Sequence, residues 1–153
     1  MKLIAAVDPG YTGAVAFVDT DGVLCDCVDM PITGEKKRRH VSAVLFRNEL
    51  FQHGADIVVI EDVHAMPAQG VSSSHKFGRA IGVVEGASAD LPTFWLTPQV
   101  WKRHHGLIGK EKDAARRLCL ERWPDDAELF ARKKDGGRAD ACLIALCWIE
   151  QNR

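Results

Sequence analysis

The chain of 153 residues carries 20 Lys and Arg against 21 Asp and Glu, and 46% of its residues are hydrophobic. This length and composition suit a single domain over residues 1–153, with a core that requires neither disulfides nor a structural metal. The near-neutral net charge gives no global argument for a nucleic-acid or membrane partner, but the basic residues are clustered, so one face can still be basic.

The five cysteines include no CxxC pair. Core thiols in a reducing compartment are therefore expected, rather than a disulfide framework or a zinc site. The N-terminal region has no apolar run long enough for a signal peptide or a membrane span. We therefore expect a cytoplasmic protein without a membrane partner.

Three short strands open the predicted fold. Apolar residues favour strands at 2–8, 13–19 and 23–30. The turns at Pro9-Gly10 and Asp21-Gly22 join these strands into an antiparallel meander.

Helices and strands alternate in the rest of the chain. Apolar spacing predicts a helix from about residue 41 to 52, which Gly54 closes, and the run DIVVIE predicts a strand buried on both faces. A loop with Pro67 and Gly70 leads through Ser72-Ser73-Ser74 into a second helix. The remaining predicted elements are a strand at TFWL, a short helix capped by Thr97 with Pro98 at its first position, and helices over about 110–123 and 138–151. This order predicts an α/β fold with a mixed five-stranded sheet flanked by helices.

Three carboxylates stand at positions that a purely structural pattern does not require. Asp8 ends the first strand, Glu61 ends the apolar run IVVIE, and Asp140 lies in the first turn of an almost wholly apolar helix. If the first and fourth strands are parallel neighbours, Asp8 and Glu61 lie side by side at their carboxyl ends, where ligand sites of open α/β sheets gather. Docking of the last helix against the sheet would bring Asp140 to the same place.

Carboxylates so close repel one another unless a cation is present, and hard divalent ions such as Mg²⁺ or Mn²⁺ take such oxygen ligands. Two such ions about 3.5–4 Å apart can activate a water and stabilise the leaving oxygen of a phosphodiester. The pattern therefore predicts metal-dependent phosphoryl transfer, with two ions in the active site. Each acid also has a simpler explanation, as a turn residue, a solvated strand end or a partner of the helix dipole, and spacing alone does not exclude these.

Four segments of the chain resemble the RuvC family of Holliday junction resolvases, in particular its small bacteriophage forms. They are AVDPGYTGAVAF, VVIEDVHAMPAQGVSSSHKFGRAIGVVEG, LTPQVWKRHHGLIGKEKDAARRL and KKDGGRADACLIAL. The resemblance covers nearly the whole chain. It implies an RNase H-like fold, a homodimer, and a crossover junction endodeoxyribonuclease that uses Mg²⁺ or Mn²⁺ to make paired symmetric nicks in branched DNA. It also implies that Asp8, Glu61 and Asp140 are its metal-binding and catalytic acids.

The fourth acid of the family is missing from its usual place. RuvC proteins commonly carry an acid or histidine three residues before the last aspartate, and this chain has Gly137 there. Asp135 lies five residues before that aspartate, in a Gly-rich loop that could bend towards the metals, and we predict that it takes the metal-binding and catalytic role. The alternative is that only three side chains bind the metal and water completes the shell.

The resemblance also implies DNA contacts. His64 stands about where the family has an aromatic residue that stacks on an unpaired base, a contact worth roughly 1–3 kcal/mol. Lys112 best matches a DNA-binding lysine near the active site, where a cation would stabilise developing charge, so we predict a catalytic role for it. The other predicted DNA-binding residues are Ser72, Ser73, Ser74, His75, Lys76, Arg79, Lys102, Arg103 and Lys110. The loop cations Lys36, Lys37, Arg38 and Arg39 either follow duplex arms or only face solvent.

Two other functions stay open. The opening DPGYTG also resembles the phosphate loop of actin-like and sugar-kinase ATPases, which would make Asp8 a nucleotide-site residue. Those enzymes need two such domains around a cleft, and this chain supplies one. A non-catalytic junction-binding protein is the other alternative, and Gly137 is its only support. Nuclease cleavage that Asp8→Asn abolishes would separate a catalyst from a binding protein.

Overall fold

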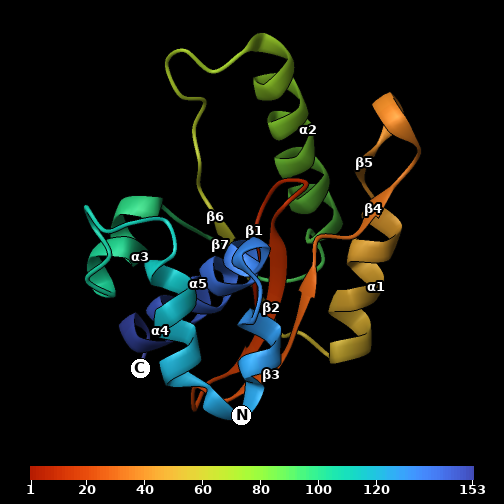
Figure 1. Cartoon of the computed structure of the whole chain (residues 1–153). Helices are drawn as coiled ribbons and strands as arrows, with labels where there is room; N and C mark the ends of the chain where they lie inside the picture. The colour runs from red at the N-terminus through yellow and green to blue at the C-terminus, as the bar shows by residue number, and fades with distance from the viewer.

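The computed structural model describes residues 1–153 and is built on a five-stranded sheet with helices on both faces (Figure 1). The strand order is β3-β2-β1-β6-β7. The strands are β1 (Leu3–Asp8), β2 (Ala14–Asp19), β3 (Leu24–Asp29), β6 (Ile57–Glu61) and β7 (Thr93–Leu96). The predicted antiparallel meander and the predicted mixed five-stranded sheet are confirmed, because β1 pairs antiparallel with β2 and parallel with β6.

The strands are buried because both faces of the sheet are covered. In β1, Ile4 and Ala6 face the cluster around the last helix, while Ala5 and Val7 face the opposite cluster. This alternation follows from the two-residue period of a strand. Every residue of β2 and β6 is buried, which agrees with the apolar runs that predicted these strands.

Two helices cover one face of the sheet. Helix α1 (Ala43–His53) starts at Ser42, whose hydroxyl accepts a hydrogen bond from the Leu45 amide, and ends at Gly54 with φ 71°. Helix α2 (Val71–Ala87) includes the three serines at 72–74 in its first turns. The prediction that these serines belong to the loop before the helix was therefore wrong. Glycine and serine at the boundary gave no cap signal strong enough to place it.

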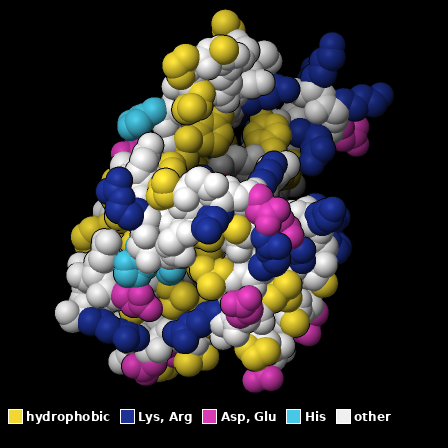
Figure 2. Space-filling model, turned by 60° about the vertical axis from the view of Figure 1, so that its left-hand side comes forward, with side chains coloured by type: hydrophobic (Ala, Val, Ile, Leu, Met, Phe, Trp, Pro, Cys, Tyr) yellow, Lys and Arg dark blue, Asp and Glu magenta, His cyan; other side chains and the backbone are white.

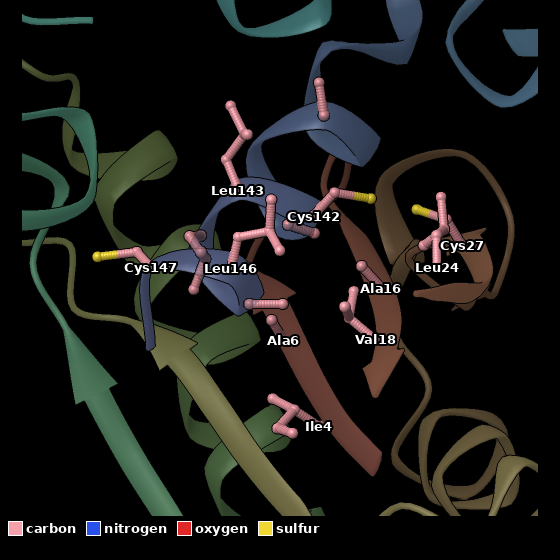
Figure 3. Close-up of a cluster of buried hydrophobic side chains, with 14 of the residues drawn as sticks. Ile4, Ala6, Ala16, Val18, Leu24, Cys27, Cys142, Leu143, Leu146 and Cys147 are labelled. Carbon is pink, nitrogen blue, oxygen red and sulfur yellow. The ribbon is translucent and has the colours of Figure 1, made fainter. Parts of the chain in front are cut away.

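The other face holds α3 (Pro98–His104), α4 (Ala114–Arg122) and α5 (Gly136–Gln151). Helix α4 starts later than predicted, because residues 105–113 form turns that include two glycines with positive φ. Helix α5 packs on β1, β2 and β3, and its side chains meet those of the three strands in one buried cluster (Figure 3). Its almost wholly apolar sequence follows from this burial on most of its circumference.

The cysteines are free, as predicted, but not all of them are core thiols. Cys27 and Cys142 lie in the buried cluster with their sulfur atoms turned towards one another (Figure 3), and Cys119 and Cys147 are also buried. Cys25 is exposed, since it points to the opposite side of the edge strand β3. None of the helices combines the length and apolar character that crossing a bilayer requires.

The segment after β3 is a hairpin rather than the predicted loop. Strands β4 (Ile32–Thr33) and β5 (His40–Val41) pair antiparallel, and a short 3-10 turn at Lys36–Arg38 forms the tip. The hairpin projects from the body of the molecule on the same side as α2 (Figure 1). Strands of two residues contain no alternation of apolar and polar side chains, so the sequence pattern could not reveal them.

Candidate active site

The parallel pairing of β1 and β6 brings two of the predicted acids together. Val7 lies opposite Ile60 in the ladder, so Asp8 and Glu61 are the next residues at the carboxyl ends of neighbouring strands. The third acid, Asp140, is carried to the same edge by the first turns of α5. The sheet and the docked helix thus place three carboxylates from distant parts of the chain in one region.

Burial is the largest cause that raises the pKa of each of the three acids. Burial, and then the negative charges of Glu61 and Asp140, raise the pKa of Asp8 well above its usual range. Burial and the charge of Glu61 likewise raise the pKa of Asp140 to about 7. Burial also raises the pKa of Glu61. Without a cation, the site therefore tends to retain protons near neutral pH.

Two residues of α3 act on this acidic group from one side. Trp101 is buried, and its indole Nε1–H donates a hydrogen bond of 2.8 Å to Oε1 of Glu61. The next residue, Lys102, places its positive charge where it lowers the pKa of all three acids. Helix α3 therefore both orients one carboxylate and supplies a nearby permanent cation.

A cavity of about 300 Å³ opens beside Asp140. Its lining includes Lys102, Lys110 and Lys112, and the charge of Lys112 lowers the pKa of Asp140. Three of the predicted basic residues therefore share a cavity with Asp140, whereas Arg103 is exposed outside it. A concave site that combines lysines with a metal-binding type of carboxylate suits a polyanion bound through metal ions.

The structure does not bring Asp135 to this group. Its carboxylate is buried and accepts hydrogen bonds from the guanidinium and the backbone amide of Arg132, the shortest at 2.7 Å. Although burial acts against ionisation, Arg132 holds the pKa of Asp135 below its usual value. Asp135 is the residue from which α5 starts, so its side chain closes a turn instead of pointing to the metals.

Gly137, at the position of the missing fourth acid, has a packing reason to be glycine. A Cβ there would lie 2.4 Å from the carbonyl oxygen of Thr12 and 3.2 Å from Oδ2 of Asp8. The first distance is shorter than any real Cβ contact, and its partner is backbone. The turn between β1 and β2 therefore occupies the space that a side chain at 137 would need.

The other predicted DNA-binding residues lie on the loop after β6 and on α2. His64 is exposed on the loop after β6, with its Nε2 at 3.9 Å from Oδ2 of Asp62. Five of the remaining residues are exposed on α2, and only Ser74 among this group is half-buried: Ser72, Ser73, Ser74, His75, Lys76 and Arg79. None of them lines the lysine-rich cavity.

The donor set fits a hard divalent cation, since all three acids are oxygen donors whose repulsion such an ion would relieve. The side chains are not closed around an ion position: no three His, Cys, Asp or Glu side chains are arranged so that they could hold one as they stand. The chemistry of the three acids thus suits a metal, although their side chains are not arranged around one position.

Sequence reasoning missed Trp101. A signal was present, because Trp101 precedes Lys102 in a helix that starts at Pro98, and a buried indole N–H requires an acceptor. Thr97 is the N-cap residue of this helix, but the predicted cap by its side chain is not formed. The pattern could not identify Glu61 as the acceptor of the indole hydrogen bond, because Glu61 is 40 residues away in the chain.

No family model and no curated protein matches the chain by sequence. Solved structures do match it. RuvC of Thermus thermophilus in complex with a Holliday junction substrate has a TM-score of 0.63 at 17% identity, over 99% of this chain and 96% of that chain. The fowlpox virus Holliday junction resolvase has a TM-score of 0.61 at 18% identity, over 97% and 99% of the two chains.

The yeast mitochondrial Holliday junction resolvase has a TM-score of 0.59 at 12% identity, over 97% of this chain and 79% of its own. These similarities extend over nearly the whole of the present chain, from β1 to α5. They agree with the sheet order and helix placement described above. The chain therefore has the RNase H-like fold of RuvC-type Holliday junction resolvases.

Proposed function

We propose that the chain is a metal-dependent endonuclease that resolves four-way DNA junctions, and other branched DNA, by paired symmetric nicks. The observation that carries this proposal is the meeting of Asp8, Glu61 and Asp140 at one edge of a resolvase-like fold. The solved neighbours include resolvases bound to Holliday junction DNA, which supports branched DNA as the substrate.

Asp8, Glu61 and Asp140 would hold Mg²⁺ or Mn²⁺, and Asp135 is left out of this set because Arg132 occupies its carboxylate. Two such ions, when bound, supply an activated water and stabilise the leaving oxygen of the phosphodiester. Trp101 keeps Glu61 in one orientation through its hydrogen bond. Lys102 and Lys112 neutralise charge beside Asp140, and their ammonium groups can stabilise the extra negative charge of the reacting phosphate.

We assign DNA binding to two surfaces. One is the cavity with Lys102, Lys110 and Lys112, to which Arg103 is adjacent in the chain. The other is formed by the loop after Glu61 and the exposed side of α2, with the residues predicted there: His64, Ser72, Ser73, Ser74, His75, Lys76 and Arg79. We place the protein in the cytoplasm as a homodimer, because two symmetric cuts in two strands require two active sites.

The non-catalytic alternative rests on the missing fourth acid, which Asp135 does not replace because Arg132 occupies its carboxylate. Close packing against the Thr12 carbonyl explains why residue 137 is glycine, and the three remaining acids favour the catalytic function. A nucleotide-binding role for Asp8 has no supporting observation in the fold comparisons.

The direct test is cleavage of a labelled synthetic four-way junction beside a linear duplex, in Mg²⁺, Mn²⁺ or EDTA. We expect paired symmetric nicks in the junction only, and none in EDTA. A junction that is bound but uncut with every metal would instead support a binding protein. Clear affinity for Mg·ATP without nuclease activity would support the ATPase alternative.

A further inference from the structure

The projecting hairpin begins at the same edge of the sheet as the acids. Asp8 is paired with Ala14, and Ala14 is paired with Asp29, so the end of β1 and the end of β3 lie in register across the sheet. The hairpin starts immediately after β3 and therefore rises from the catalytic edge. Figure 1 shows it beside α2, which contacts β5.

Four consecutive cations occupy the hairpin: Lys36, Lys37, Arg38 and Arg39. All four are exposed, and none forms an ion pair, although Glu35 is adjacent. Figure 2 shows Lys and Arg side chains gathered on the projecting upper right of the molecule. Most arginines elsewhere are neutralised, as Arg116 is by Asp113. The hairpin thus keeps an uncompensated positive charge on a chain whose net charge is −1.

A concavity of about 350 Å³ lies at the base of the hairpin. Basic side chains from two distant segments, Arg39 and Lys134, line it together with Arg132. The acids in its lining are already paired, Asp135 with Arg132 and Asp29 with Arg138. Arg39 and Lys134 are therefore the surplus charges of this concavity.

Residues of the turn between β1 and β2 form part of the concavity and bind the hairpin. The Tyr11 hydroxyl donates a hydrogen bond of 2.6 Å to the backbone carbonyl of Arg39, which ties the hairpin to this turn. Thr12 and Gly13 complete the lining. A Cβ on Gly137 would lie 2.4 Å from the Thr12 carbonyl oxygen and 3.2 Å from Oδ2 of Asp8, so both atoms are close to this one position. The backbone that lines the concavity therefore lies near the carboxylate of Asp8.

We propose that this concavity binds a backbone phosphate of the DNA strand that flanks the cleaved bond, and that Lys36, Lys37 and Arg38 follow the duplex arm beyond it. This inference rests on the proposed function. Successive phosphates of one strand advance about 3.4 Å along the duplex axis, so phosphates near the cleaved one can reach across a single backbone turn. Arginine suits the role because its planar guanidinium pairs with two phosphate oxygens.

The test compares two double variants in EDTA, where binding is separated from cleavage. Arg39→Ala/Lys134→Ala removes the two surplus charges of the concavity. Lys2→Ala/Arg122→Ala removes two unpaired, exposed cations at the opposite edge of the sheet and is the matched control. Affinity for a labelled four-way junction is measured over a range of salt concentrations, and circular dichroism verifies folding.

Loss of this one phosphate contact should lower the slope of log K against log salt concentration by about 1 and weaken binding about tenfold or more. The control should change neither. The hairpin variant Lys36→Ala/Lys37→Ala/Arg38→Ala should weaken binding to junctions with long arms and leave binding to junctions with truncated arms unchanged.

This inference would be overturned if the concavity variant and the wild type had the same slope of log K against log salt concentration. It would also be overturned if the concavity and control variants lost the same affinity for the junction. If either result were found while the wild type still cut junctions, the proposed function would stand. Only the phosphate site in the concavity would then be rejected. A wild type that neither binds nor cuts junctions would overturn both.

Discussion

Asp8, Glu61 and Asp140 carry negative charge into a region that water reaches poorly, and Lys102 is the cation that faces all three. The cost of this arrangement appears as retained protons when no metal is bound. A site of this kind gives up stability so that it can bind a cation strongly, which is a common property of functional sites. Two predictions follow from it at the level of single residues.

The first concerns pH. The pKa of Asp140 is raised to about 7 from an ordinary value of 3.8, so the folded protein holds a proton that the unfolded chain has released. The free energy of unfolding of the metal-free protein should therefore fall as the pH rises from about 4 to about 7. Asp140→Asn, which cannot ionise, should reduce this fall and raise stability at pH 8 by on the order of 2 kcal/mol.

Urea unfolding of both proteins at pH 5 and pH 8, with EDTA present, measures the effect. An Asp140→Asn variant with the same pH dependence as the wild type would show that Asp140 does not have the raised pKa. Addition of Mg²⁺ or Mn²⁺ at pH 8 should stabilise the wild type more than the variant, since only the wild type keeps all three ligands.

The second prediction concerns Trp101. Phenylalanine preserves an aromatic ring in the core but removes the indole N–H that holds Oε1 of Glu61. Hydrogen bonds to charged groups contribute about 1.5–3 kcal/mol, so Trp101→Phe should weaken Mn²⁺ binding and slow cleavage by about 10–100-fold. Calorimetric titration with Mn²⁺ and single-turnover cleavage measure these quantities.

Trp123→Phe is the matched control. Trp123 is also buried, and its Nε1–H donates to the carbonyl of Gly22, far from the acids in the fold, at 3.2 Å. This substitution should lower stability without changing Mn²⁺ affinity. Equal losses of Mn²⁺ affinity in the two variants would mean that Trp101 acts only through general packing.

At the level of elements, the start of α5 is the most tightly constrained part of the site. Gly136 and Gly137 both have helical backbone there, but only Gly137 faces the turn between β1 and β2. Gly137→Ala should destabilise the protein by about 1–3 kcal/mol, because the added Cβ meets backbone that cannot move freely. Gly136→Ala meets nothing within 4 Å and should be neutral or stabilising by about 0.4–1 kcal/mol.

Chemical denaturation of the two alanine variants gives the comparison. Equal stabilities would show that the turn can yield, and then an acid at position 137 could be accommodated. The same clash predicts that Gly137→Asp fails to add a fourth metal ligand and instead reduces cleavage.

The sequence was most informative where a pattern repeats within one element. The strands at 2–8, 13–19 and 23–30 were predicted within one residue of β1, β2 and β3, because each is a short, mainly apolar segment between turns. The side-by-side arrangement of Asp8 and Glu61 was also predicted, since it follows from a parallel pair of strands. These inferences need only local periodicity and the geometry of a sheet.

The rest depends on contacts between distant segments. The role of Asp135 was predicted from its distance in sequence to Asp140, yet the structure pairs it with Arg132. Gly137 looked like a missing ligand until the Thr12 carbonyl was seen to occupy its space. The meeting of Arg39 with Lys134 joins segments 95 positions apart, which no pattern in a single sequence reveals.

At the level of the whole molecule, the charge of this nearly neutral chain is unevenly distributed over the surface. Acids and the cavity lysines lie at the carboxyl ends of the parallel strands, while the basic hairpin rises from the same edge. Under the proposed function, such an arrangement would attract DNA to one edge despite the net charge of −1. Binding should therefore weaken steeply with salt, as the phosphate contacts release counterions.

The central claim is that Asp8, Glu61 and Asp140, without Asp135, form a metal-dependent centre that cuts DNA junctions. The most direct measurement is single-turnover cleavage of a labelled four-way junction in Mn²⁺ by Asp8→Asn, Glu61→Gln, Asp140→Asn and Asp135→Asn, with junction binding measured in EDTA. The first three variants should bind the junction and cut it slower by on the order of 10²–10³-fold or more. Asp135→Asn should be less stable but, where folded, cut at close to the wild-type rate. Cleavage by Asp8→Asn at the wild-type rate, or a loss in Asp135→Asn as large as in the other three, would contradict the claim.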